Sequence, residues 1–157
     1  MSIDPVVRRA LHGDAGELDR LQTLARAAIV LVRGGALRLA ECTPVTDWAS
    51  LIDDQDAAVF VGSLLDASVS YMVVHLSRNA DRGIITQAFV EPEGRELGLG
   101  DTMLEHAVEV VRAAGLSGIE ATALPGDRET KNMYERGGLT ARKLTVYKSL
   151  LVETTDI

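Results

Sequence analysis

The sequence has one cysteine and no long apolar run, and these absences exclude several classes of protein. Cys42 has no second cysteine with which to form an internal disulfide, which suits a reducing compartment. The longest apolar run, Ala27 to Val32, falls far short of the roughly 20 residues that span a bilayer. The chain begins MSIDPVVRRALHGD, with charges where a secretory signal has an apolar segment. We therefore expect a cytoplasmic protein without membrane attachment.

An excess of basic residues is also missing, because 16 Lys and Arg stand against 23 Asp and Glu, a formal charge of −7. Non-specific binding to nucleic acid requires a positive field, so no such partner is expected. His12, His75 and His106 show no metal-ligand spacing with one another or with Cys42, and no metal site is expected. The G-x-S-x-G motif of serine hydrolases is absent as well.

The apolar periodicity predicts one globular domain over residues 1–157. Helical spacing begins after Asp14, which lies three residues before Glu17 as in a capping box, and it ends at Gly34-Gly35. A short helix is expected after Thr46. Further along, the patterns predict strands over 57–65, 69–76, 84–90 and 119–124, helices through 103–114 and over 128–136, and a final strand or hairpin over 139–151.

The connections between these elements predict an α/β fold with a mixed, mostly antiparallel sheet. Two tight connections join the first three predicted strands, which indicates an antiparallel meander. The long helical crossover that follows places the third and fourth strands parallel to each other. Helices are then available to cover both faces of the sheet.

A glycine-containing loop joins the strand that ends near Val90 to the next helix. Its glycines lack the GxGxxG spacing of dinucleotide sites and the GK[ST] ending of a Walker loop. What remains is Arg-x-x-Gly-x-Gly, from Arg95 to Gly100, at a helix N-terminus. Unpaired N–H groups and the helix dipole make such a terminus a phosphate site, and glycine permits close approach. Spacing alone fits a flexible strand–helix turn equally well.

The segment VEPEGRELGLGDTML resembles the cofactor-binding motif of the GNAT superfamily of N-acyltransferases. The later segment LPGDRETKNMYERGGLTARKL is similar to that family's next motif, a short helix that carries a tyrosine before a glycine turn. The resemblance extends from about Asp56 to Leu150. It implies a GNAT-type sheet whose parallel central strands splay apart, and acetyl-CoA as cosubstrate in the gap between them.

The resemblance assigns a set of residues to the cofactor. The strand end at Phe89 and Val90 would pair with the pantetheine amides. The loop would cradle the pyrophosphate, through Arg95, Glu96, Leu97, Gly98, Leu99 and Gly100, with Thr102 as a hydroxyl donor. Asp127, which stands where many members have Asn, and Lys131 would lie beside the cofactor. The carboxylates of Glu96 and Asp101 are expected to face away from the phosphates.

The same resemblance makes Tyr134 the proton donor to the departing thiolate. The general base stays open, because the position at which some members carry a glutamate is occupied here by Ile84. Glu91 is the leading candidate, and Glu120 and His75 are others. A chain of water molecules, or an amine that arrives already neutral, would serve as well.

The acceptor side has a conspicuous charge asymmetry. Between Arg38 and Arg78 there is no basic residue, while six carboxylates occur: Glu41, Asp47, Asp53, Asp54, Asp56 and Asp66. An acidic rim would concentrate a cationic amine, although a solvated surface explains the same run of carboxylates.

The sequence thus predicts an acetyl-CoA-dependent N-acetyltransferase that acts on a small-molecule or peptide amine. A non-catalytic acyl-CoA-binding module and a protein-contact domain are the alternatives, and a homodimer stays open.

Overall fold

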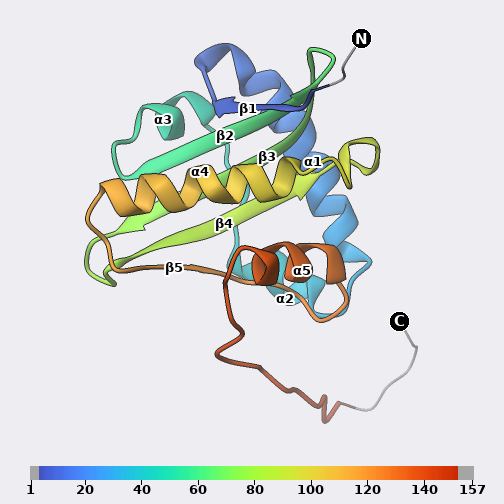
Figure 1. Ribbon diagram of the computed structural model, residues 1–157. Coiled ribbons are helices and arrows are strands. Elements are labelled where there is room, and N and C mark those ends of the chain that lie inside the picture. Colours follow the sequence, from blue (N-terminus) through green and yellow to red (C-terminus); the bar gives the residue numbers. More distant parts are fainter. Residues whose placement is uncertain (1–3, 152–157) are drawn as a thin grey trace.

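A computed structural model describes residues 4–151 and shows a five-stranded sheet with helices on both faces (Figure 1). The strands are β1 (Val6–Arg9), β2 (Ala57–Leu64), β3 (Ala67–Ser77), β4 (Arg82–Val90) and β5 (Gly118–Ala121), in the spatial order β1-β2-β3-β4-β5. The helices are α1 (Ala15–Val30), α2 (Gly35–Glu41), α3 (Trp48–Asp53), α4 (Leu99–Ala113) and α5 (Arg128–Arg136). Within this part of the chain, no helix is both long and apolar enough to cross a membrane.

The sheet is mixed, as the sequence predicts. The pairs β1–β2, β2–β3 and β3–β4 are antiparallel, and β4–β5 is parallel. Side chains alternate between the faces. Phe60 and Met72 belong to the core beneath α4 and α5, whereas Val61 and Tyr71 belong to the core beneath α1 and α3. Because both faces are covered, the middle strands are almost continuously apolar.

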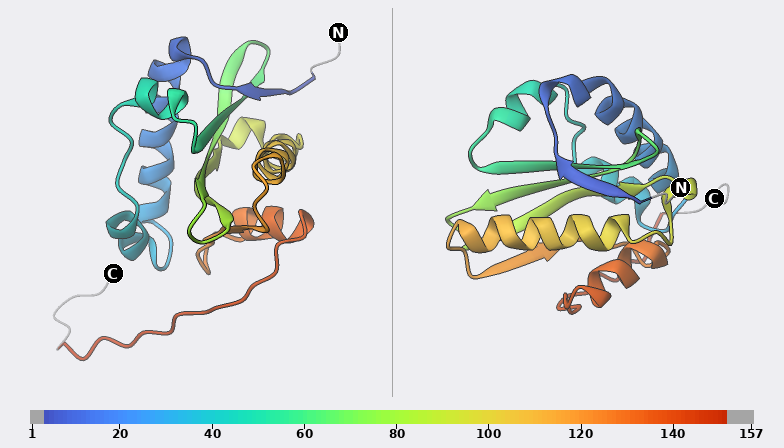
Figure 2. Two further views of the ribbon diagram at one scale, coloured as in Figure 1. Left: turned by 90° about the vertical axis from the view of Figure 1, so that its left-hand side faces the viewer. Right: turned by 45° about the horizontal axis from the view of Figure 1, so that its top comes forward.

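The helices on the two faces of the sheet come from different parts of the chain (Figure 2). The N-terminal helices lie on one face, and α4 lies on the other. Helix α4 buries Met103, Leu104, Ala107 and Val111 at helical spacing. It ends before Gly115, whose φ of +76° is the left-handed conformation that glycine adopts without strain.

The strands β4 and β5 pair over only part of their length, and this positions the site. Their register runs from Arg82↔Gly118 to Ile85↔Ala121 and then stops. At the same level β4 contains a bulge, because Ile85 and Gln87 face consecutive residues of β3 and Thr86 is extra. Beyond Thr86, one edge of β4 has no neighbouring strand in the described part of the chain.

Three elements differ from the sequence prediction. The strand β1 was not predicted, because four residues with two arginines give little apolar alternation. Helix α2 was not predicted either, since it starts at Gly35, directly after Gly34 with φ +83°, where glycines indicated only an end. The predicted strand or hairpin over 139–151 is wrong: this tail, as far as residue 151, has no regular structure and no strand beside it (Figure 1). Alternation predicts a strand-like pattern but does not supply a pairing partner.

Candidate active site

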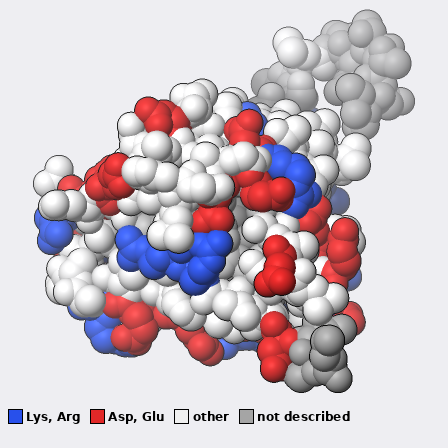
Figure 3. All heavy atoms as spheres, turned by 90° about the horizontal axis from the view of Figure 1, so that it is seen from above, with Lys and Arg blue, Asp and Glu red and all other residues white. Residues whose placement is uncertain are grey.

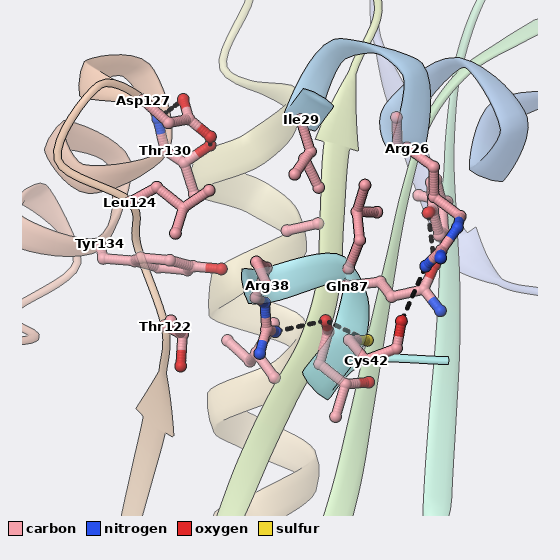
Figure 4. A pocket seen from close by; sticks show the side chains of 16 residues that line it. Arg26, Ile29, Arg38, Cys42, Gln87, Thr122, Leu124, Asp127, Thr130 and Tyr134 are labelled. Carbon is pink, nitrogen blue, oxygen red and sulfur yellow. Dashed lines mark hydrogen bonds between the residues drawn. The ribbon is translucent and has the colours of Figure 1, made fainter. Parts of the chain in front are cut away.

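A pocket lies where β4 and β5 separate, and it is walled by parts of the chain that are distant in sequence (Figure 4). The bulged part of β4 contributes Thr86 and Gln87. Helices α1 and α2 contribute Arg26 and Arg38, and α5 contributes Tyr134. The cavity volume is about 60 Å³. A site of this size suits a small reacting group rather than a large ligand.

Helix α5 holds Tyr134 at this pocket. Its N-cap is Asp127, whose carboxylate accepts hydrogen bonds from the Thr130 N–H (3.2 Å) and hydroxyl (2.7 Å). This cap fixes the start of the helix, so that Met133 and Tyr134 lie on its buried side. The Asp127 side chain lines the pocket, and its two oxygens are engaged in the cap.

The Tyr134 side chain is only 7% exposed, and its hydroxyl points into the pocket (Figure 4). Among residues 4–151, that hydroxyl has no hydrogen-bond partner. Burial raises its pKa above the ordinary phenol value of about 10, with a smaller opposing influence of Arg38. The group therefore keeps its proton at neutral pH and can act as a donor.

The open edge of β4 offers backbone groups beside the pocket. The Glu91 N–H donates to the Val69 carbonyl (2.8 Å), so alternation turns the polar groups of Phe89 toward β3. Those of Ala88 and Val90 face the edge that β5 leaves uncovered. The Val90 carbonyl accepts a hydrogen bond there from Arg95 Nε (3.2 Å). An extended ligand could thus pair with Ala88 and Val90; sequence analysis named Phe89 in place of Ala88.

The loop after β4 presents a run of unpaired donors. In the described chain, the six consecutive N–H groups from Glu96 to Asp101 donate no intramolecular hydrogen bond, and the first bond of α4 is from Thr102 N–H to the Gly98 carbonyl (2.9 Å). Gly98 is the N-cap, with φ +79° and open space around it. Leu99 anchors the loop, being 1% exposed, whereas Leu97 is at the surface. This arrangement fits an anionic group.

Gly100 is constrained by packing rather than by the loop. A Cβ at this position would lie 2.5 Å from Met133 Sδ. The glycine therefore lets α4 lie against α5, and a substitution there would disturb the fold as well as any ligand.

Charged residues near the loop are engaged with one another. Arg95 Nε lies 3.0 Å from Glu129, and Lys131 Nζ lies 2.9 Å from Glu135. Asp101 pairs with Arg136 (3.1 Å). Thr102 lies in the first turn of α4, and its carbonyl is within 2.8 Å of His106 Nδ1. None of these residues lines the pocket.

Glu91, the leading candidate for the base, is not brought into the pocket. Its carboxylate binds Arg20, with Oε1 2.9 Å from Nη1, and its side chain is 12% exposed. Arg20 also donates to the Ser68 carbonyl (2.8 Å), which ties α1 to the end of β4. Glu120 pairs with Arg82, and neither it nor His75 lines the pocket.

The polar residues that sequence analysis missed come from α1, α2 and the inner strands. The Tyr71 hydroxyl donates to Gln87 Oε1 (2.5 Å), and Gln87 Nε2 donates to Gln22 Oε1 (3.1 Å). Arg38 Nη2 and Cys42 Sγ both donate to the carbonyl of the bulged Thr86. No motif marks these residues, because only the fold brings them together.

Comparison with known proteins gives a family match and fold matches. The model of the Acetyltransferase (GNAT) family matches residues 35–138, more than half of the chain. No curated protein matches the sequence.

Many solved structures share the fold. A mutant of the BH1408 protein from Bacillus halodurans matches with a TM-score of 0.73 at 20% identity, covering 93% of this chain and 99% of that one. An aminoglycoside acetyltransferase, meta-AAC0020, from an uncultured soil metagenomic sample and in complex with sisomicin, gives 0.68 at 15%, covering 95% and 97%. AAC(6')-Iy, in complex with the bisubstrate analog CoA-S-monomethyl-acetylneamine, gives 0.64 at 11%, covering 94% and 99%.

Proposed function

We propose, since the chain belongs to the GNAT family of acetyltransferases, that it transfers the acetyl group of acetyl-CoA to a primary amine within a ternary complex. Members of this family use acetyl-CoA, and one fold neighbour is held with a CoA-containing bisubstrate analog. The observation that carries the proposal is the buried Tyr134 hydroxyl, without a hydrogen-bond partner among residues 4–151, directed into the pocket between β4 and β5.

The residues around the gap fit acetyl-CoA. The donors from Glu96 to Asp101 suit the pyrophosphate, and the edge groups of Ala88 and Val90 suit the amides of the pantetheine arm. The thioester supplies an activated acetyl group with a fair leaving group. Arg95 in the loop and Lys131 in α5 would add positive charge at the outer phosphates by exchanging their present carboxylate partners, Glu129 and Glu135, for phosphate oxygens.

The chemistry requires one bond to form and one to break. The amine nitrogen attacks the thioester carbonyl carbon, a C–N bond forms and the C–S bond breaks. The attacking nitrogen releases a proton to water as the amide forms, while Tyr134 donates its proton to the departing sulfur and then regains one from water. An edge N–H of β4 would polarise the carbonyl, as oxyanion donors do. Because Arg20 holds the Glu91 carboxylate outside the pocket, we propose that the amine arrives neutral or loses its proton to water.

The test is turnover with a panel of amines, in which released CoA thiol is measured. Tyr134→Phe keeps the packed ring and should lower kcat by roughly 10²–10⁴-fold while acetyl-CoA affinity stays nearly unchanged. Glu91→Gln is the matched control, and it should leave kcat and its pH dependence unaltered. An unchanged kcat in Tyr134→Phe, with chemistry rate-limiting, would remove Tyr134 from the mechanism.

The rival is a non-catalytic acyl-CoA-binding module. It predicts acetyl-CoA binding by calorimetry but no acetylated product with any amine in the panel. Product formation that requires Tyr134 excludes it.

A homodimer is a further part of the proposal. The tail after α5 alternates as a strand does, with Leu144 and Val146 on one side, and both side chains are more than 80% exposed. The strand β5 lies at the edge of the sheet. In a homodimer, the tail of one copy would pair with the edge strand β5 of the other, and its apolar side chains would be buried in the interface.

A further inference from the structure

Two arginines line the pocket without a carboxylate partner. Within residues 4–151, neither Arg26 nor Arg38 forms an ion pair. Arg26 Nη1 donates to the Cys42 carbonyl (2.7 Å), and Arg38 Nη2 donates to the Thr86 carbonyl (2.8 Å). A guanidinium has five N–H donors, so each retains several for a ligand.

Cys42 links the two arginines in the pocket, because Arg26 donates to its carbonyl and its Sγ shares the Thr86 carbonyl with Arg38. Arg38 is close enough to Tyr134 to influence its pKa, and Arg26 is likewise close to Tyr71. Figure 4 shows both side chains reaching from the helices toward β4, near Gln87. This part of the pocket is therefore formed by helices α1 and α2 together with the bulged part of β4.

Among residues 4–151, Asp127 is the only carboxylate that lines the pocket, and it is engaged in capping α5. The pocket is thus positive in a chain whose formal charge is −7. Half-buried guanidinium groups that lack a counter-charge bear a desolvation cost. A ligand carboxylate would offset it with paired, charge-assisted hydrogen bonds.

The acidic stretch predicted to attract a cationic acceptor lies elsewhere. None of its six carboxylates lines the pocket. Asp47 caps α3, Asp53 binds His12 (2.7 Å), and Asp56 faces Arg78 (3.6 Å). On the face seen in Figure 3, acidic and basic groups are interspersed rather than gathered in one acidic field.

We propose that the acceptor is a small amine that also carries a carboxylate, an amino acid or a close derivative, and that Arg26 and Arg38 bind its carboxylate. The inference rests on the proposed acetyl transfer and names its substrate class. A substrate of this class differs from the polycationic aminoglycosides for which the neighbour meta-AAC0020 is named.

The experiment compares amines that differ only in the carboxylate. L-lysine against cadaverine, and amino acids against their carboxamides, are assayed with acetyl-CoA. The carboxylate compounds should have at least tenfold higher kcat/KM. In Arg26→Gln and in Arg38→Gln this preference should fall by tenfold or more, with acetyl-CoA affinity by calorimetry unchanged. Arg38→Lys, which keeps the charge but not the planar fork, should keep part of the preference.

Arg33→Gln is the matched control, because Arg33 is an exposed arginine between α1 and α2 that does not line the pocket. It should retain the full preference. Equal use of acids and amides, or a loss of acetyl-CoA affinity in the pocket variants, would overturn the inference.

A thermal-shift arm separates this inference from the proposed function. The same acids and amides are added to the protein with acetyl-CoA bound. If the acids alone raise the melting temperature, and Arg26→Gln removes the effect, the carboxylate site stands even when no amine is acetylated. If neither class shifts it and no preference is seen in turnover, the inference fails.

Discussion

At the scale of single residues, Tyr134 combines two properties that rarely occur together. Its ring is part of the core with Met133 and Leu104, yet its hydroxyl faces the pocket. The packing fixes the position of the ring. Because the hydroxyl has no hydrogen-bond partner among residues 4–151, its proton is available for transfer to a ligand. Burial costs the ionised form more than the neutral one, so the pKa rises.

This direction predicts the pH profile of kcat. As pH rises, the bound amine loses its proton and kcat increases. Since the pKa of Tyr134 is raised, its proton is retained, and kcat should not fall again up to pH of about 10. The profile is measured with saturating substrates, and circular dichroism confirms that the fold is intact. A descending limb centred near the ordinary phenol pKa would contradict this role.

Residues of the site differ in how far the sequence could predict them. Tyr134 and the loop from Arg95 to Gly100 are contiguous motifs, so local pattern sufficed. Arg26, Arg38 and Gln87 come from three elements and meet only after folding. Glu91 was chosen for its place at a strand end, but sequence gives no sign that Arg20, far away along the chain, binds its carboxylate.

At the scale of elements, the loop and α4 act as one unit. Gly98, the last residue before α4, has a left-handed conformation. The backbone N–H groups on either side of it have no hydrogen-bond acceptor in the described chain, because the first turn of a helix has no preceding carbonyls to bind. The opposite end of α4 also has a left-handed glycine, Gly115, with open space around it. The two ends share a conformation, and only one adjoins the proposed cofactor gap.

Gly98→Asn should therefore weaken acetyl-CoA binding more than tenfold while changing the melting temperature little. Asn tolerates the left-handed conformation better than other side chains, and its bulk would obstruct the donors. Gly115→Asn is the control, with equal backbone strain and no expected loss of affinity. The acetyl-CoA affinity of both variants is measured by calorimetry. Equal affinities of the two variants would show that the loop is not part of the cofactor site.

Most helices and strands were predictable because the apolar periodicity of each segment is sufficient to indicate its structure. Helix α5 runs from Arg128 to Arg136 as expected, and the strands of the meander agree to within a few residues. Helix α2 and β1 were missed because tertiary contacts, not local patterns, stabilise them. Helix α2 gains from the Arg38 and Cys42 bonds to Thr86, and β1 gains from its ladder with β2.

At the scale of the whole molecule, the tail and the edge of the sheet are complementary. Five large side chains of the tail are at least 82% exposed: Leu144, Val146, Tyr147, Leu150 and Leu151. Burying each of the four aliphatic side chains among them is worth about 1.5–3 kcal/mol. The outer side of the four-residue strand β5 has no partner strand among the residues that the structure describes.

We expect sedimentation to show a dimer that depends on this tail. Leu144→Lys combined with Val146→Lys should yield a monomer, because two charges would enter the buried pairing. Leu31→Lys changes an equally exposed leucine at the end of α1 and should leave the dimer intact. A wild-type chain that sediments as a monomer at every concentration would contradict the dimer.

Because one edge of β4 is only partly paired, amide hydrogen exchange along that strand should show whether the cofactor gap is occupied. The amides of Ala88 and Val90 belong to an inner strand of the sheet, yet no strand within residues 4–151 pairs with them on that side. In the free chain their protons are open to isotope exchange without unfolding. When a pantetheine arm occupies the gap, exchange at those two positions would be governed by how often the arm leaves.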